Sequence, residues 1–319
     1  MINKKKIRIG IIGLGKMGLN HLNILESLNK VEIIFTHDLD KNKHANRKFN
    51  FIKSLSEIST NLVDAVIIAT PTSTHFDIIK KIGKNIKNVF VEKPLAQNFN
   101  ETKKIINFAI KNKINLKVGF IERFNPAIAS LLSILKKNEK KVSIDFTRAS
   151  PISDRIKDVD VITDLMVHDI DLAIFLNGKV KTIKSFGHKK NNMIAHANVV
   201  LIHYSGVITN LLASRITQKK IRTINITLEK KYIACDLLKK EVNMYTNTMI
   251  KNLNNNFNYK SISEIIETGH KEPLLLEILA FIDNCHGINN KYLADYSDSY
   301  EIMNICEKIK KEINFSNEK

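Results

Sequence analysis

A histidine and two aspartates stand at helical spacing in the second half of the chain. Asp164, His168 and Asp171 occupy positions i, i+4 and i+7 of a helical pattern over residues 163–172, so they share one helix face. Histidine gains or loses a proton near neutral pH, which suits it to acid–base catalysis. Two other interpretations stay open: a capping acid beside a hydrogen-bonded histidine, and a metal site that no further His or Cys cluster completes. We predict catalysis here and no metal.

A short apolar strand near the N-terminus runs into three glycines at the G-x-G-x-x-G spacing. Gly13 permits a tight turn, Gly15 leaves room for a pyrophosphate against the backbone, and Gly18 lets the following helix pack close to the strand. The unpaired N–H groups at the start of that helix would face the phosphates. An incidental glycine-rich turn is the alternative. The pattern predicts a dinucleotide site that includes Gly13, Gly15, Lys16, Met17 and Gly18.

The choice of dinucleotide depends on Asp38, which follows the second predicted strand and stands 20 residues after Gly18. A carboxylate at this position hydrogen-bonds the adenosine ribose and disfavours a 2′-phosphate. Asp38 therefore predicts NAD as the cofactor. Lys41 and Lys43 are close enough in sequence to bind a phosphate, so NADP stays an open alternative.

Three polar groups directly follow predicted strands: residues 70–75 after the strand at 65–69, residues 92–94 after 89–91, and residues 122–126 after 116–120. Each alone is an ordinary loop with turn residues. Because the carboxyl ends of parallel strands meet at one edge of a sheet, together they predict a ligand site. We expect Arg123 and Asn125 on the substrate side, since an arginine fork suits a diphosphate. A surface ion pair explains Arg123 equally well.

The order of elements predicts two domains. Strand and helix patterns alternate to about residue 120, which is typical of a doubly wound parallel sheet. Beyond residue 126 strand patterns follow one another with few helices between them, which favours an antiparallel sheet. We predict an N-terminal Rossmann domain over residues 1–122 and a C-terminal α+β domain with a large open antiparallel sheet over residues 123–319. The last helix can pack back on the first domain, and the open sheet predicts a homodimer or homotetramer.

Composition narrows the class of partner. The chain has 319 residues and a net charge of +18, but its lysines are scattered and form no arginine-rich stripe, so we expect no nucleic-acid partner. No stretch reaches the length of a membrane span. Cys235, Cys285 and Cys306 are far apart, which fits neither a disulfide framework nor a zinc site. These features predict a soluble cytoplasmic protein with a small-molecule substrate and no membrane partner.

The whole chain resembles the glucose-fructose oxidoreductase/inositol dehydrogenase (Gfo/Idh/MocA) family of NAD(P)-dependent sugar oxidoreductases. The motifs that carry the resemblance are the glycines at 13–18, Pro71 with His75, Glu92-Lys93-Pro94, and the Asp164-x-x-x-His168 pair. Within that family, residues 118–126, 163–172 and 214–218 are similar to UDP-N-acetylglucosamine 3-dehydrogenases and related nucleotide-sugar oxidoreductases.

The resemblance implies that Lys93, Asp164 and His168 form the catalytic group, with Asp164 and His168 also in contact with the substrate. Oxidising a secondary alcohol requires a base for the hydroxyl proton and a partner for the developing negative charge on oxygen. We expect His168 as the base and Lys93 as the partner, although the two can exchange roles. The expected cofactor contacts beyond the glycines are Thr70, Pro71, His75, Glu92 and Lys93.

The implied reaction is oxidation of the 3-hydroxyl of UDP-N-acetylglucosamine or a related nucleotide sugar. A dehydrogenase of a free sugar or inositol is the enzymatic alternative. A dinucleotide-sensing regulator is the alternative from a different class of protein. Such a regulator requires neither Lys93 nor His168, so the presence of both residues favours an enzyme.

Overall fold

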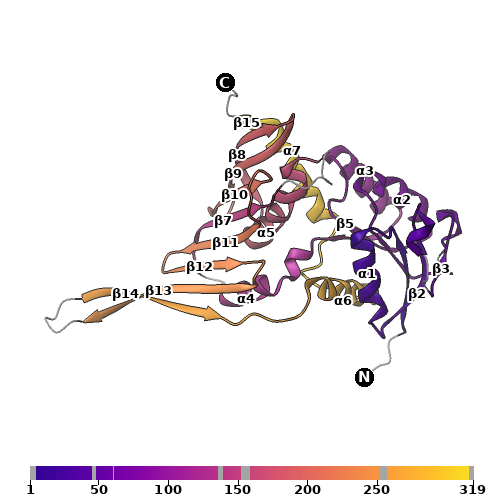
Figure 1. The fold of residues 1–319 in the computed structure, drawn as a ribbon, viewed down its shortest axis with the longest axis horizontal. Helices are drawn as coiled ribbons and strands as arrows, with labels where there is room; N and C mark the ends of the chain where they lie inside the picture. Colours follow the sequence, from indigo (N-terminus) through magenta and orange to yellow (C-terminus); the bar gives the residue numbers. More distant parts are fainter. Residues whose placement is uncertain are drawn as a thin grey trace. The chain divides into compact units, whose positions relative to one another are not determined.

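The chain forms two compact units in the computed structural model, which describes residues 5–44, 48–59, 61–135, 139–151, 159–251 and 257–315 (Figure 1). The first unit comprises Met1–Phe124 and Glu272–Asn304, and the second comprises Asn125–Lys271 and Ile305–Lys319. We expected a second domain over residues 123–319 whose last helix can pack back on the first domain. In the structure, residues 272–304 belong to the first unit.

The first unit is built on a parallel sheet of six strands in the order β3-β2-β1-β4-β5-β6. Its strands are β1 (Ile7–Ile12), β2 (Val31–His37), β3 (Asn50–Phe51), β4 (Ala65–Ile68), β5 (Asn88–Glu92) and β6 (Asn115–Gly119). All four residues of β4 are buried, as expected for a strand covered on both faces. The strand order reverses next to β1, which places a ligand crevice beyond the carboxyl ends of these strands.

Helices and short turns follow these strands, and two further helices come from much later in the chain. The helices are α1 (Lys16–Glu26), α2 (His75–Ile82), α3 (Phe99–Lys111), α6 (Pro273–Cys285) and α7 (Tyr296–Glu312), and the 3₁₀ turns are η1 (Lys41–His44), η2 (Leu55–Glu57), η3 (Thr72–Thr74) and η4 (Ile121–Phe124). Ile278 and Phe281 of α6 lie in one apolar core with Ile9 and Leu22, which explains why this late helix belongs to the first unit. Helix α7 begins in the first unit and ends in the second.

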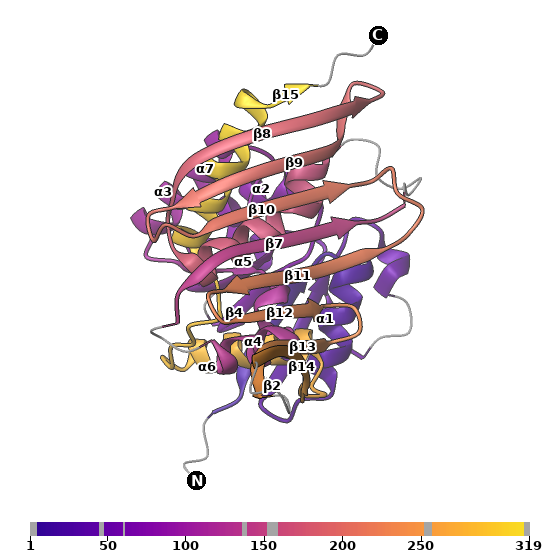
Figure 2. The same ribbon diagram turned by 90° about the vertical axis from the view of Figure 1, so that its left-hand side faces the viewer.

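The second unit contains a sheet of nine strands in the order β14-β13-β12-β11-β7-β10-β9-β8-β15 (Figure 2). Its strands are β7 (Lys141–Ala149), β8 (Val180–Lys190), β9 (Met193–His203), β10 (Ile208–Ser214), β11 (Ile221–Leu228), β12 (Lys231–Asp236), β13 (Glu241–Lys251), β14 (Phe257–Ile266) and β15 (Asn314–Phe315). The pairs β7/β10 and β8/β15 are parallel and the others are antiparallel. The predicted fold class, a Rossmann domain followed by a largely antiparallel sheet, is therefore confirmed.

One face of this second sheet is packed and the other is open. Alternate side chains such as Ile144 and Phe146 of β7 are buried. Over that face lies α5 (Val167–Asn177), together with the turn η5 (Ile162–Met166) that leads into it, and both contact β7 and β10. Helix α4 (Pro126–Ile134) contacts β12 and β13. Within the described part of this unit, no helix crosses the face that is turned toward the viewer in Figure 2.

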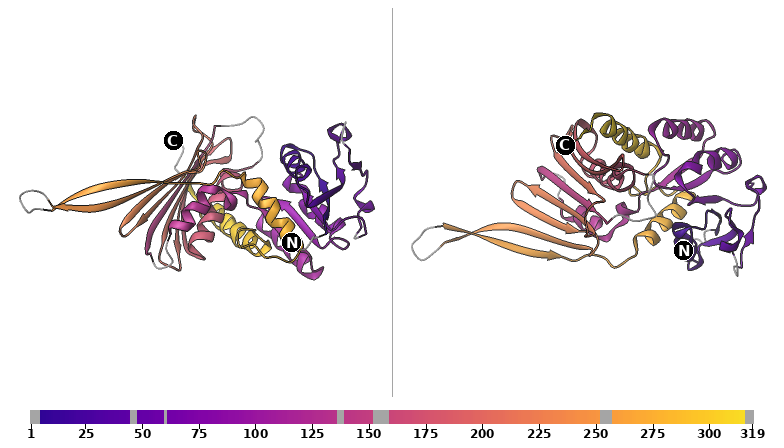
Figure 3. Two further views of the ribbon diagram at one scale, coloured as in Figure 1. Left: turned by 90° about the horizontal axis from the view of Figure 1, so that it is seen from below. Right: turned by 45° about the horizontal axis from the view of Figure 1, so that its top comes forward.

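The hairpin of β13 and β14 was not predicted from the sequence. Only Glu241–Thr246 of β13 pairs with β12, so the outer part of the hairpin is a two-stranded ribbon that projects past the other strands of its sheet (Figure 3). Asparagine, threonine and lysine are frequent over residues 241–260, which obscures the period-two apolar pattern of a half-buried strand.

Candidate active site

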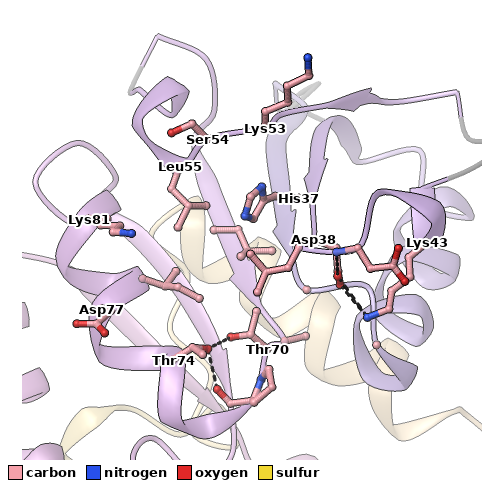
Figure 4. Close-up of a pocket in the computed structure, with 18 residues that line it drawn as sticks. His37, Asp38, Lys43, Lys53, Ser54, Leu55, Thr70, Thr74, Asp77 and Lys81 are labelled. Atoms are coloured by element: carbon pink, nitrogen blue, oxygen red, sulfur yellow. Dashed lines mark hydrogen bonds and ion pairs between the residues drawn. The ribbon is translucent and has the colours of Figure 1, made fainter.

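A pocket of about 670 Å³ lies at the carboxyl ends of β1, β2 and β4 in the first unit (Figure 4). The sequence-predicted residues that line it are Gly13, Gly15, Asp38, Thr70 and Pro71. It is also lined by Lys43, which the sequence analysis named as a candidate phosphate contact, by Thr74 of the predicted polar group at 70–75, and by His37, Lys53 and Lys81, which were not predicted. These additional residues come from β2, η1, η3, α2 and the segment that follows β3, so their convergence depends on the fold rather than on a local motif.

The three fingerprint glycines have three different surroundings. Gly13 has a φ of +95°, and a Cβ there would lie 2.7 Å from the Ala69 backbone. A Cβ on Gly18 would lie 1.8 Å from the carbonyl oxygen of Gly13. A Cβ on Gly15 would meet nothing within 4 Å, although Gly15 lines the pocket. Gly13 and Gly18 are therefore required by the protein's own packing, whereas the space beside Gly15 is open.

Helix α1 begins immediately after this space. Gly15 is its N-cap residue and provides no side-chain hydrogen bond to the first turn. The first-turn N–H groups, which include those of Lys16 and Met17, are thus available to an anion, and the helix dipole favours negative charge at this end. An open glycine beside such a helix N-terminus fits the pyrophosphate of a dinucleotide.

Asp38 closes the other side of the pocket, directly after β2. Its Oδ2 accepts a hydrogen bond from the Leu14 N–H at 2.7 Å, its Oδ1 accepts one from the Asp40 N–H at 2.9 Å, and Lys43 Nζ lies 3.2 Å from Oδ1. Burial raises the pKa of this carboxyl, but the two N–H donors and Lys43 outweigh burial and hold the pKa below its usual value. Asp38 is therefore an oriented anion tied to the glycine turn.

His75 was predicted as a cofactor contact, but it is not among the residues that line the pocket, and its ring is fully buried. Its Nε2 is 3.0 Å from the Thr70 carbonyl oxygen and its Nδ1 is 3.3 Å from the Leu95 carbonyl oxygen. Burial lowers the pKa of this imidazole, although both carbonyls oppose the shift. His75 thus braces the loop after β4 against the loop after β5, which contains Lys93. This brace can set the position of Lys93 without contact between His75 and a cofactor.

Asp164 and His168 lie where helix geometry changes in the second unit. η5 is a π-helical turn and α5 follows it without a break, so Asp164 and His168 stand on either side of the junction. Both side chains are half-buried, whereas Asp171 is fully buried. The i→i+5 bonding of the π turn changes the register of Asp164 relative to His168, whereas Asp171 is buried although it stands on α5 only three residues after His168. Such turns are frequent at functional sites.

Two buried arginines hold this helix in place by binding its aspartates. The sequence analysis assigned a role to neither arginine. Arg148 of β7 binds Asp169, the neighbour of His168, with Nε 2.9 Å and a terminal nitrogen 2.8 Å from Oδ1. Arg215 lies 2.5 Å from Asp164 Oδ2 and donates a second hydrogen bond to the Val159 carbonyl oxygen. The inward position of Arg148 on an alternating strand was the available sequence signal.

Arg123 and Asn125 are both bound within the protein. Arg123 is buried, and its two terminal nitrogens lie 3.3 and 3.1 Å from the carboxylate of Asp298. Asn125 caps α4 by accepting a hydrogen bond from the Ala127 N–H, and its amide donates to the Leu237 carbonyl oxygen. The alternative explanation of Arg123 as an ion pair matches this contact, except that the pair is buried rather than on the surface. A role of either residue on the substrate side stays a prediction.

Lys93 belongs to the first unit, whereas Asp164 and His168 belong to the second. Within the described residues, no group of three His, Cys, Asp or Glu side chains is arranged to hold a metal ion. Nor does any described helix have the length and apolar character that crossing a membrane requires. The cytoplasmic location stays a prediction.

Comparison with known proteins agrees with the glycine site. Residues 7–120 match the oxidoreductase family with an NAD-binding Rossmann fold, Gfo/Idh/MocA. The UDP-N-acetylglucosamine 3-dehydrogenase of Acidithiobacillus ferrooxidans is 28% identical over 245 residues, which are 75% of this chain and 77% of that protein. The scyllo-inositol 2-dehydrogenase (NAD⁺) of Bacillus subtilis is 31% identical over 59% of each chain. A solved structure of the Acidithiobacillus enzyme aligns with a TM-score of 0.84 at 23% identity, over 97% of this chain and 98% of that one.

The fold, the dinucleotide pocket and the matched sequence define the chain as an NAD-binding oxidoreductase that acts on a small molecule. Its N-terminal domain, residues 7–120, belongs to the Gfo/Idh/MocA family. The resemblance inferred from the motifs is confirmed.

Proposed function

We propose that the protein oxidises the 3-hydroxyl of UDP-N-acetylglucosamine or a related nucleotide sugar, with NAD as the hydride acceptor. One observation carries the choice of substrate. The matches with the Acidithiobacillus UDP-N-acetylglucosamine 3-dehydrogenase and with the inositol dehydrogenase both cover more residues than the first unit contains, but the former spans 75% of this chain and the latter 59%, so the former reaches further into the unit that holds Asp164 and His168. Similarity there bears on the substrate, whereas similarity in the Rossmann domain bears on the cofactor.

The proposed chemistry assigns a separate task to each of two residues. NAD, when bound, accepts the hydride that leaves the alcohol carbon. His168 takes the hydroxyl proton, because an imidazole is a competent base near neutral pH. The Lys93 ammonium hydrogen-bonds the alcohol oxygen as negative charge develops on it. Either residue can act as the base if the other supports the oxygen.

Asp164 is proposed to orient the sugar or the imidazole, and its contact with Arg215 supports this role. A carboxylate that is already bound by a guanidinium keeps one rotamer at low entropic cost. The Arg148–Asp169 pair is almost fully buried and holds α5 on the sheet beside His168. The helix that carries His168 is therefore anchored from inside the second unit.

The proposed function is tested by NADH absorbance with a panel of UDP-N-acetylglucosamine, other UDP-sugars, free sugars and inositols. Turnover with UDP-N-acetylglucosamine at a kcat/KM at least about tenfold above every free sugar and inositol would support the proposal. The 31% identity with an inositol dehydrogenase makes scyllo-inositol the second candidate. Preferred turnover of an inositol would replace the proposed substrate, and absence of turnover with the whole panel would overturn it.

We expect NAD to bind at least about tenfold more tightly than NADP, because the anionic Asp38 would repel a 2′-phosphate. Asp38→Asn keeps an oxygen for the Leu14 N–H while removing the charge, so it should narrow that preference. Lys43 would then be released from Asp38 and could bind the phosphate. Titration with both cofactors measures this effect, and the exposed Glu32→Gln is a control with the same change of charge. An unchanged preference in Asp38→Asn would contradict the role of Asp38.

We also propose that the open sheet face forms the interface of a homodimer or homotetramer. Phe186, Ile202, Ile208 and Tyr232 are each at least 38% exposed, and they stand at alternate, outward positions of their strands. Apolar side chains gathered on one uncovered face are typical of an interaction surface. Light scattering after size-exclusion chromatography would overturn this proposal if the protein were monomeric at micromolar concentration.

A further inference from the structure

A buried hydrogen bond joins α1 to the carboxyl end of β5. His21 has no exposed surface, and its Nε2 lies 2.6 Å from Oε1 of Glu92. The imidazole packs edge-on against Phe90 with ring centroids 5.5 Å apart. Glu92 Oε2 lies 3.3 Å from the point where a Cβ on Gly119 would stand, so the glycine leaves room for this carboxylate. The Glu92 side chain is 13% exposed, so it is held from inside the unit and still reaches the surface.

The hydrogen bonding defines which group donates. Among the described residues, Nδ1 of His21 is buried and has no hydrogen-bond partner. A proton on Nδ1 would therefore be a buried donor without an acceptor, which is costly. A neutral ring with its proton on Nε2 avoids that cost, because Nε2–H then donates to the carboxylate of Glu92. His21 thus holds Glu92 as an oriented hydrogen-bond acceptor.

The strand order places Glu92 away from the adenosine contact. Asp38 follows β2 and Glu92 ends β5, and β1 and β4 lie between these strands. Three strand spacings separate β2 from β5, which is about 14 Å along the sheet edge. A dinucleotide that crosses this edge with its adenosine ribose at Asp38 extends its other half toward β4 and β5.

We propose that His21 is a positioning residue that fixes Glu92 as a negative charge at the nicotinamide half of the site. This inference rests on the proposed function in that it takes NAD to bind at the glycine turn. The ring of NAD⁺ carries a positive charge that the ring of NADH lacks. An oriented carboxylate near this ring stabilises the positive charge and so favours binding of the oxidised cofactor. The next residue in the chain is Lys93, the proposed partner of the reacting oxygen. The His21–Glu92 pair therefore tunes the relative affinity for the two redox states.

The test is direct titration of NAD⁺, NADH and ADP-ribose into the full-length protein and its variants, with no substrate present. Glu92→Gln removes the charge, and His21→Leu removes the donor. Each should raise the ratio of Kd for NAD⁺ to Kd for NADH about tenfold, while Kd for ADP-ribose stays within about twofold. The double variant should match Glu92→Gln alone, because His21 acts through Glu92. His21→Gln retains an N–H donor and should restore part of the ratio.

Several results would overturn the inference. A merely structural role of His21 would weaken all three ligands together and leave the ratio unchanged. Additive effects of the two substitutions would show that His21 does not act through Glu92. If His21→Leu fails to fold, an unchanged ratio in Glu92→Gln still refutes the proposal, and Glu32→Gln controls for the loss of one negative charge. Wild-type protein that binds neither NAD⁺ nor ADP-ribose would overturn the proposed function itself, and this inference with it.

Discussion

Replacing Lys93 with methionine should lower kcat about a thousandfold, and His168→Ala should lower it by a similar factor. Each substitution removes one of the two groups that are proposed to act on the hydroxyl oxygen and its proton. Methionine keeps the length and apolar stem of lysine without the charge. The change is measured as NADH formation with saturating substrate and NAD.

The controls for this pair are substitutions of the same type at exposed positions. Lys84→Met and His270→Ala remove an exposed lysine and an exposed histidine, and they should retain wild-type turnover. Affinity for ADP-ribose should stay within about twofold in all four variants, since this ligand lacks the reacting ring. The pH dependence of kcat/KM in each catalytic variant should lose one limb, and the limb that is lost identifies the base. Wild-type turnover in both Lys93→Met and His168→Ala would show that the catalytic assignment is wrong.

Alanine substitutions at Gly15 and at Gly18 should have different main effects, one on NAD binding and the other on stability. Gly15→Ala should fold with wild-type thermal stability, because a Cβ at this position meets no protein atom within 4 Å. It should nevertheless weaken NAD binding at least about a hundredfold, since the methyl group fills the space proposed for the pyrophosphate. Isothermal titration with NAD and a thermal melt without it measure the two effects.

Gly18→Ala should show a different result. Its Cβ would lie 1.8 Å from the Gly13 carbonyl oxygen, so α1 or the glycine turn must move. Such overpacking against backbone costs about 1–3 kcal/mol or more of unfolding free energy. The melt of Gly18→Ala should therefore move to lower temperature in the absence of any ligand. Equal thermal stability of the two variants, or unaltered NAD affinity in Gly15→Ala, would contradict the assignment of the three glycine roles.

The parallel sheet could be predicted because each of its strands has a local signal. Runs such as residues 65–69 are apolar at every position, and the glycine turn has a distinctive spacing. The placement of α6 could not be predicted in the same way. Its apolar residues indicate a buried helix, but the pattern does not say that Ile278 and Phe281 pack with the N-terminal strands. That choice is made by tertiary packing, across more than 200 residues of sequence.

The candidate site shows the same division between local and tertiary information. Asp164 and His168 could be found from their spacing, whereas the π turn between Ile162 and Met166 depends on how the helix meets β7 and β10. Arg215 and Arg148 are separated in sequence from the aspartates they bind by 51 and 21 residues, so no local pattern identifies these pairs. His21 and Glu92 are 71 residues apart, so no local pattern identifies this pair either.

The most direct test follows the hydride itself. UDP-N-acetylglucosamine with deuterium on carbon 3 of the sugar is incubated with the protein and NAD, and the reduced cofactor is analysed by mass spectrometry. We predict one deuterium per molecule of reduced cofactor and a 3-oxo sugar in equal amount. Reduced cofactor that carries no deuterium, or no reduction of NAD at all, would contradict the proposed oxidation at this carbon.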